Sequence, residues 1–102
     1  MHEVTDSDGV RIELVGELDL SVAGRLRDRL DALAQPGAKV LLDLSKLDFI
    51  DSSGINVIIT YHRQAEQDGW VLLVAQHLTL PVRRVINVMG LNTVFWPATP
   101  ES

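Results

Sequence analysis

The chain has 102 residues, enough for one hydrophobic core and too few for two. Its apolar fraction of 46% and charged fraction of 23% are ordinary for a globular protein and exclude a disordered or fibrous composition. The formal net charge is -5 and the only adjacent basic pair is Arg83-Arg84, too little to neutralise a phosphate backbone. We therefore expect a single domain over residues 1–102 that does not bind nucleic acid.

Cofactor chemistry and membrane insertion are also not expected. The chain has no cysteine, which excludes disulfides and thiolate metal sites, and its three histidines lack the close spacing of a metal cluster. The N-terminus carries His2, Glu3, Asp6 and Asp8 where a signal peptide needs an apolar stretch. No apolar run approaches the roughly 18 residues of a membrane span, so we expect a cytoplasmic protein.

The first third of the chain predicts a hairpin followed by a helix. Apolar and charged residues alternate over residues 10–14, which is typical of a strand with one face in the core, and Asp8-Gly9 before it favours a tight turn to residues 2–5. Apolar residues then recur every three or four positions over residues 22–34. Ser21 is the expected N-cap of this helix.

The middle of the chain predicts two strands around a second helix. Residues 39–44 form a nearly continuous apolar run, which indicates a central strand covered on both faces. The helical period returns from Asp51 to Ala65 and ends near Gly69, which can adopt the left-handed C′ conformation. Residues 70–75 read as another strand of the buried type.

The last third predicts a third helix and a final strand. Thr79 is the expected N-cap, with Pro81 in the first turn and Gly90 closing the helix, and residues 93–96 read as a strand. Strands that alternate with helices imply right-handed crossovers. We expect an α/β domain with a mixed, mainly parallel sheet of about four to five strands and three main helices.

The segment from Asp51 to Ile55 (Asp-Ser-Ser-Gly-Ile) is the strongest candidate for function. It places two hydroxyls and a carboxylate at a helix N-terminus, where unpaired N–H groups and a partial positive charge favour an anion or a phosphorylated side chain. Either Asp51 or Ser52 can accept one of these N–H groups. From the residues alone, a simple N-cap is the favoured explanation of the segment.

Three stretches resemble the STAS family of anti-sigma factor antagonists. Residues 51–55 are similar to that family's Asp-Ser-Ser/Thr-Gly-aliphatic phosphorylation motif, residues 16–19 to its Gly-Glu-Leu-Asp segment, and residues 89–91 to its Gly-Leu turn. The resemblance covers about residues 10–96. Two features depart from it: the chain stops where many members continue into another helix, and Asn56 stands where relatives often carry a small residue.

The resemblance implies a phosphorylation switch. Ser52 would be phosphorylated by an anti-sigma factor that is also a serine kinase, and the unphosphorylated form would bind that partner. The partner-binding rim would comprise Asp19, Asp51, Ser53, Gly54, Ile55 and Asn56. A phosphatase is a further implied partner. The kinase would hold the ATP, so the chain itself would need no cofactor and would not be an enzyme.

Several alternatives stay open at this stage. The chain could be a non-switching STAS subunit of a transporter ATPase complex or of a larger signalling assembly, or could bind a nucleotide near Ser52. Asp19 could simply cap the next helix. A Ser/His/Asp hydrolase is disfavoured, because His62 lies about 15 Å along the same predicted helix from Ser52. Both a monomer and a homodimer are compatible with the sequence.

Individual side chains are also interpreted structurally. Asp43, inside an apolar strand, is expected to make a structural hydrogen bond, and His62 is expected to be partly buried or in an interface. The aromatic residues Trp70, Phe95 and Trp96 are expected to pack against strands rather than form a ligand cage.

Overall fold

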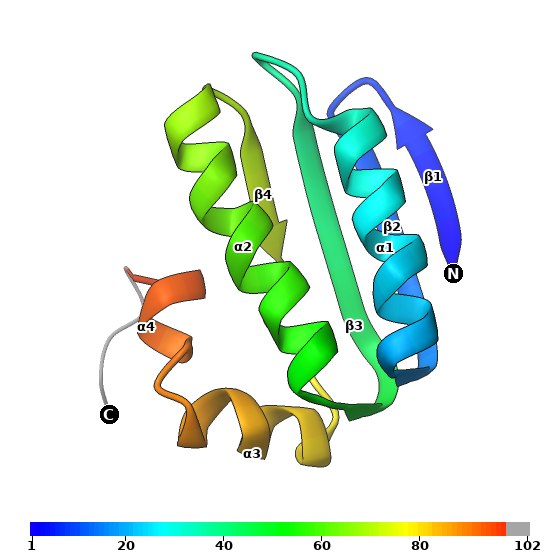
Figure 1. The fold of residues 1–102 in the computed structure, drawn as a ribbon, viewed down its shortest axis with the longest axis vertical. Coiled ribbons are helices and arrows are strands. Elements are labelled where there is room, and N and C mark those ends of the chain that lie inside the picture. The colour runs from blue at the N-terminus through cyan, green and yellow to red at the C-terminus, as the bar shows by residue number, and fades with distance from the viewer. Residues whose placement is uncertain (98–102) are drawn as a thin grey trace.

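The computed structural model describes residues 1–97 as one sheet with helices (Figure 1). Its strands are β1 (His2–Asp6), β2 (Gly9–Leu18), β3 (Lys39–Ile50) and β4 (Val71–Val74). Its helices are α1 (Leu20–Leu33), α2 (Ser52–Asp68), α3 (Leu80–Val88) and the short α4 (Asn92–Phe95). The predicted α/β class is confirmed, with four strands and three main helices.

The strand order is β1-β2-β3-β4, with β1 antiparallel to β2 and the other pairs parallel. The expected N-terminal hairpin and the central position of β3 are therefore confirmed. The turn of the hairpin depends on Gly9, because its φ of 135° is accessible mainly to glycine and a Cβ there would lie 2.3 Å from the backbone oxygen of Lys39.

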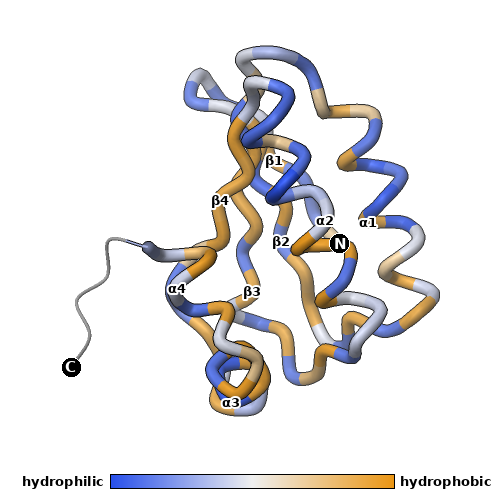
Figure 2. The backbone as a smooth tube through the Cα atoms, turned by 60° about the vertical axis from the view of Figure 1, so that its left-hand side comes forward, coloured by the Kyte–Doolittle hydropathy of each residue, from blue (hydrophilic) through white to orange (hydrophobic). Residues whose placement is uncertain are grey.

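Helices α1 and α2 cover one face of the sheet (Figures 1 and 2), and the apolar side chains of that face are buried. Burial follows the strand period of two, so that Ile12 and Leu14 of β2 and Leu42 and Leu44 of β3 point into this core. On α2, Ile55 and Ile58 complete it from above the sheet. The core therefore lies between one sheet face and two helices.

The opposite face of the sheet is open in the described part of the chain, and we call it the open face. Our expectation that β3 is covered on both faces is wrong, as is the buried type assigned to β4. Within the run 39–44 of β3, Leu41 is only partly buried, and Leu73 of β4 is 46% exposed. Continuous apolar runs indicate burial on both faces only when a second layer of helices is present.

The predicted strand over residues 93–96 is also wrong, because most of it lies in helix α4. The N–H of Phe95 donates to the oxygen of Leu91 over 2.9 Å, closing a helical turn. The indole Nε1 of Trp96 then donates to the oxygen of Val74 over 2.6 Å. Phe95 packs edge-on against His62, which confirms that this histidine is partly buried. Phe95 therefore packs from a helix, and Trp96 packs from the residue directly after it, rather than from a strand.

Candidate functional site

The candidate site lies where helices α1 and α2 begin side by side, at the carboxyl ends of β2 and β3 (Figure 1). The final residues of the two parallel strands, Leu18 and Ile50, are register partners. The N–H of Asp51 donates to the oxygen of Leu18 over 3.2 Å, which ties the start of α2 to the end of β2. Parallel strands thus place two helix N-termini at one edge, with their partial positive charges together.

Asp51 is the N-cap of α2. Its Oδ1 accepts the N–H of Gly54 over 3.0 Å and the hydroxyl of Ser53 over 2.5 Å. The hydrogen bonds from Ser53 and Gly54 hold the pKa of the Asp51 carboxyl below its usual value. Asp51 is therefore ionised at neutral pH, and its oxygens are directed at its own helix.

Asp19 performs the same role for α1, so our assignment of Ser21 as the N-cap is wrong. The Oδ1 of Asp19 accepts the N–H of Val22 over 3.2 Å and the hydroxyl of Ser21 over 3.0 Å. These two bonds lower the pKa of Asp19, although the nearby charge of Asp51 opposes the shift. The capping role left open for Asp19 and its position beside the Asp51 cap are both present in the structure.

Ser52 differs from its neighbours in having a free hydroxyl. It is the first residue of α2, is exposed, and makes no side-chain hydrogen bond with the part of the chain that the structure describes. Ser53, one residue on, is half-buried and donates its hydroxyl to Asp51. An incoming reagent can therefore reach the Ser52 oxygen without breaking a helix cap.

Gly54 and Ile55 shape the site from below. A Cβ on Gly54 would lie 2.6 Å from Cγ of Leu18, so only glycine lets α2 approach β2 this closely. Ile55 is fully buried, whereas Asn56 is exposed. Of the predicted rim, Gly54 and Ile55 therefore offer no side-chain surface to a partner.

Comparison with known proteins assigns the family. The family model described as Mlab, STAS domain, matches residues 1–96. The chain belongs to the STAS domain family. The Anti-sigma F factor antagonist of Paenibacillus polymyxa is 32% identical over 78% of this chain and 69% of its own length.

Solved structures agree on the fold. The anti-sigma factor antagonist SpoIIAA in its unphosphorylated form matches with a TM-score of 0.72 at 26% identity, over 88% of this chain and 80% of SpoIIAA. Mglu matches with a TM-score of 0.63 at 24% identity, but this STAS domain spans only 20% of that longer chain, so the likeness concerns the fold alone.

The sequence did not identify two exposed leucines of this STAS domain. Leu20, the first residue of α1, is 76% exposed, and Leu80, the first residue of α3, is 59% exposed. The available signal was that Leu20 falls outside the apolar stripe of its own helix.

The expected N-cap Thr79 does precede α3, but its hydroxyl donates to the oxygen of Leu47 over 2.6 Å rather than capping the helix.

A groove of about 430 Å³ runs from the site between α1 and α2. It begins at Leu20 and Ser53 and is also lined by Arg27. Among residues 1–97, no group of three or more histidine or acidic side chains is placed to hold a metal ion. No helix in the same range is long and apolar enough to cross a membrane.

Proposed function

We propose that this STAS domain is an anti-sigma factor antagonist that works by partner switching. With Ser52 unmodified, it binds an anti-sigma factor that is also a serine kinase. Phosphorylation of Ser52 by that kinase releases it, and a phosphatase restores the binding form. The cycle takes place in the cytoplasm, the kinase holds the ATP, and this chain contributes a binding surface rather than catalysis.

The observation that carries the proposal is the free, exposed hydroxyl of Ser52 at the start of α2. Phosphorylation there leaves the cap bonds of Asp51 to Ser53 and Gly54 in place. The helix N-terminus favours a negative group, so the domain tolerates the phosphate and stays folded. The names of the Paenibacillus relative and of SpoIIAA support the same function.

The release step follows from the charges around Ser52. Asp19 and Asp51 are both ionised, because hydrogen bonds lower the pKa of each carboxyl. A phosphoserine adds about -1.5 to -2 charges beside them. A partner that covers this surface would have to bury a dianion next to two carboxylates, which disfavours the complex strongly. The exposed residues Leu20 and Asn56 then provide neighbouring contact surface.

Phosphopeptide mapping tests the kinase half of this proposal. The wild type, Ser52→Ala and Ser53→Ala are incubated with ATP and an extract of the cells that produce the protein. We expect phosphate on Ser52 in the wild type and in Ser53→Ala, and none in Ser52→Ala, because only the Ser52 hydroxyl is free. Label that persists in Ser52→Ala would contradict the assignment.

Binding to the captured anti-sigma factor tests the release step. We expect Ser52→Asp to raise the dissociation constant at least about tenfold, since each factor of ten needs only about 1.4 kcal/mol. Gln64→Asp is the matched control, because it adds the same charge at an exposed position further along α2. If a folded Ser52→Asp bound as tightly as the wild type, charge would not drive release. A partner that binds stably while Ser52 stays unmodified would instead indicate a non-switching subunit.

A further inference from the structure

The open face carries apolar side chains from all four strands. The strand register and the exposure pattern place on it Val4, Val15, Leu41, Phe49, Val71 and Leu73. Val4 is 58% exposed and Val15 is 52% exposed. No other element of residues 1–97 covers them, although parallel strands such as β2, β3 and β4 are usually buried on both faces. The exposed apolar surface therefore requires an explanation.

Four charged side chains near the centre of the open face are paired within the chain. The guanidinium of Arg11 donates to the carboxylate of Asp43, which also accepts the N–H of Ser45 over 2.9 Å. The side chain of Asp43 is 7% exposed, so the hydrogen bond expected of it is confirmed. The ammonium of Lys46 lies 3.6 Å from the carboxylate of Glu13. A surface that covers this face therefore meets few unpaired charges at its centre.

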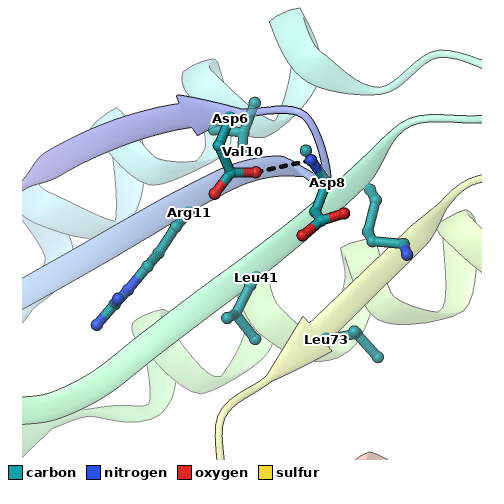
Figure 3. A pocket seen from close by; sticks show the side chains of 8 residues that line it. Asp6, Asp8, Val10, Arg11, Leu41 and Leu73 are labelled. Atoms are coloured by element: carbon teal, nitrogen blue, oxygen red, sulfur yellow. Dashed lines mark hydrogen bonds between the residues drawn. The ribbon is translucent and has the colours of Figure 1, made fainter.

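The face is shallow and accessible. Figure 3 shows it with the helices behind the sheet, and Leu41 and Leu73 lie side by side on β3 and β4. Arg11 extends along the sheet next to them. The hollow that these three residues help to line is about 270 Å³, bounded at the hairpin end by Asp6 and Asp8. Such a surface fits another flat surface better than it fits a small molecule.

We propose that the open face is an interface between two copies of this chain. Two sheets pack face to face about 10 Å apart, and a flat apolar face whose central charges are paired within the chain is complementary to a copy of itself. An oppositely charged partner is disfavoured because Arg11, Asp43, Lys46 and Glu13 are already neutralised within the chain. This interface lies across the sheet face rather than at the strand ends, so both Ser52 hydroxyls of the dimer stay accessible.

The size of the face determines how stable the dimer is. Four strands about 4.8 Å apart and at most about 30 Å long present no more than roughly 600 Å² per copy. A standard stable interface buries about 800 Å² per partner. Each copy also carries a net charge of -5, so the two copies repel each other at long range. The dimer is therefore concentration-dependent, and added salt strengthens it by screening this repulsion.

Sedimentation equilibrium on the whole chain, from micromolar to near-millimolar concentration, tests the proposal. We expect a mass of 11.3 kDa at low concentration and a rise towards twice that mass at high concentration, more so at high salt. Leu73→Lys and Val15→Lys place a charge on the face and raise the dimer dissociation constant at least about tenfold. The control is Val88→Lys on α3, which is 86% exposed and lies off the face, and it leaves the dimer unchanged.

Each outcome supports or overturns the dimer interface without depending on the proposed function. A wild type that stays monomeric at the highest concentration overturns the dimer and leaves the face to a different protein. A dimer that survives both Leu73→Lys and Val15→Lys, or that Val88→Lys disrupts, places the contact elsewhere and also overturns it. Circular dichroism confirms that each variant folds, and Val15→Lys decides the test if Leu73→Lys unfolds. Phosphorylation of Ser52 proceeds in the face variants, because none of them changes the start of α2.

Discussion

Helices α1 and α2 begin with the same capping arrangement, but they differ in the exposed residue that directly follows the capping aspartate. In residues 19–22 and in residues 51–54, an aspartate caps the helix by accepting a backbone N–H three residues on and a serine hydroxyl two residues on. The residue directly after the cap is Leu20 in α1 and Ser52 in α2, and both are exposed. The comparison teaches that the aspartate and the second serine hold the helix, while the residue between them is available to a partner.

The largest effect on this comparison is expected from Gly54→Ala. The new Cβ would lie 2.6 Å from Cγ of Leu18 and 3.0 Å from its backbone oxygen, so α2 must move away from β2. We expect a loss of about 3 kcal/mol in the free energy of unfolding, measured by urea denaturation.

Gly24→Ala in α1 is the matched control for Gly54→Ala. The nearest atom to its new Cβ is a guanidinium nitrogen of Arg27 at 3.8 Å. Alanine there should stabilise the helix by about 0.5–1 kcal/mol. If the two substitutions had equal effects, close contact between α2 and β2 would not be what distinguishes the two helix starts.

Lowering the pH should reveal the contribution of the Asp43 carboxylate to the free energy of unfolding. Burial of Asp43 opposes its ionisation, but hydrogen bonds from Ser45 and Arg11 outweigh burial and lower the pKa of Asp43 to about 2. Because the folded pKa is depressed, this stabilisation is present above pH 3.8 and is lost as the pH falls towards about 2. It amounts to at most about 2 kcal/mol, since Arg11 is half exposed and partly screened.

The measurement is the free energy of unfolding of the wild type and of Asp43→Asn from neutral pH to pH 2. Asp43→Asn should be less stable at neutral pH and should lose less stability on acidification. If Asp43→Asn lost as much stability as the wild type between neutral pH and pH 2, other carboxylates would dominate the pH dependence of stability.

Asp19→Asn and Asp51→Asn separate charge from hydrogen bonding at the two helix starts. Asparagine caps helices about as well as aspartate, so both variants should stay folded at neutral pH with a small loss of stability. The hydrogen bonds that lower the pKa of Asp19 and Asp51 make each cap strongest when ionised. The loss should therefore be fully present above the ordinary pKa of an aspartate and should disappear as the pH falls from there through the lowered pKa of the folded state, which thermal melts against pH can check.

The sequence predicted the long elements because their periodicity extends over many residues. Residues 22–34 and 51–65 carry enough turns for the apolar stripe to define each helix. The four-residue helix α4 has no such period, and its apolar Val94 and Phe95 read equally well as a strand. Coverage of the open face could not be predicted from β3 and β4 alone, because it depends on where distant helices pack.

The residues of the site could be predicted from the sequence, but not which of them cap the helices and which stay exposed. The motif at residues 51–55 located the serine and its helix start, whereas which oxygen caps the helix depends on side-chain rotamers. In α1 the cap is two residues earlier than expected, at Asp19 instead of Ser21. Both residue types are good caps, so pattern alone cannot choose between them. Leu20 was missed because its position outside the apolar stripe of α1 indicates an exposed side chain but not a contact surface.

The smallest effect on stability is expected from Leu20→Ser, which makes the first turn of α1 resemble that of α2. Leu20 is 76% exposed, so the free energy of unfolding should change by no more than about 0.5 kcal/mol. Phosphorylation should still occur at Ser52 alone, because Val22 stands in α1 where α2 has Gly54, so the two first turns still differ. Phosphopeptide mapping checks this. If it found label in α1, the kinase would recognise only the capping aspartate and the serine after it. Weaker binding of the anti-sigma factor without new label would instead identify Leu20 as part of the contact surface.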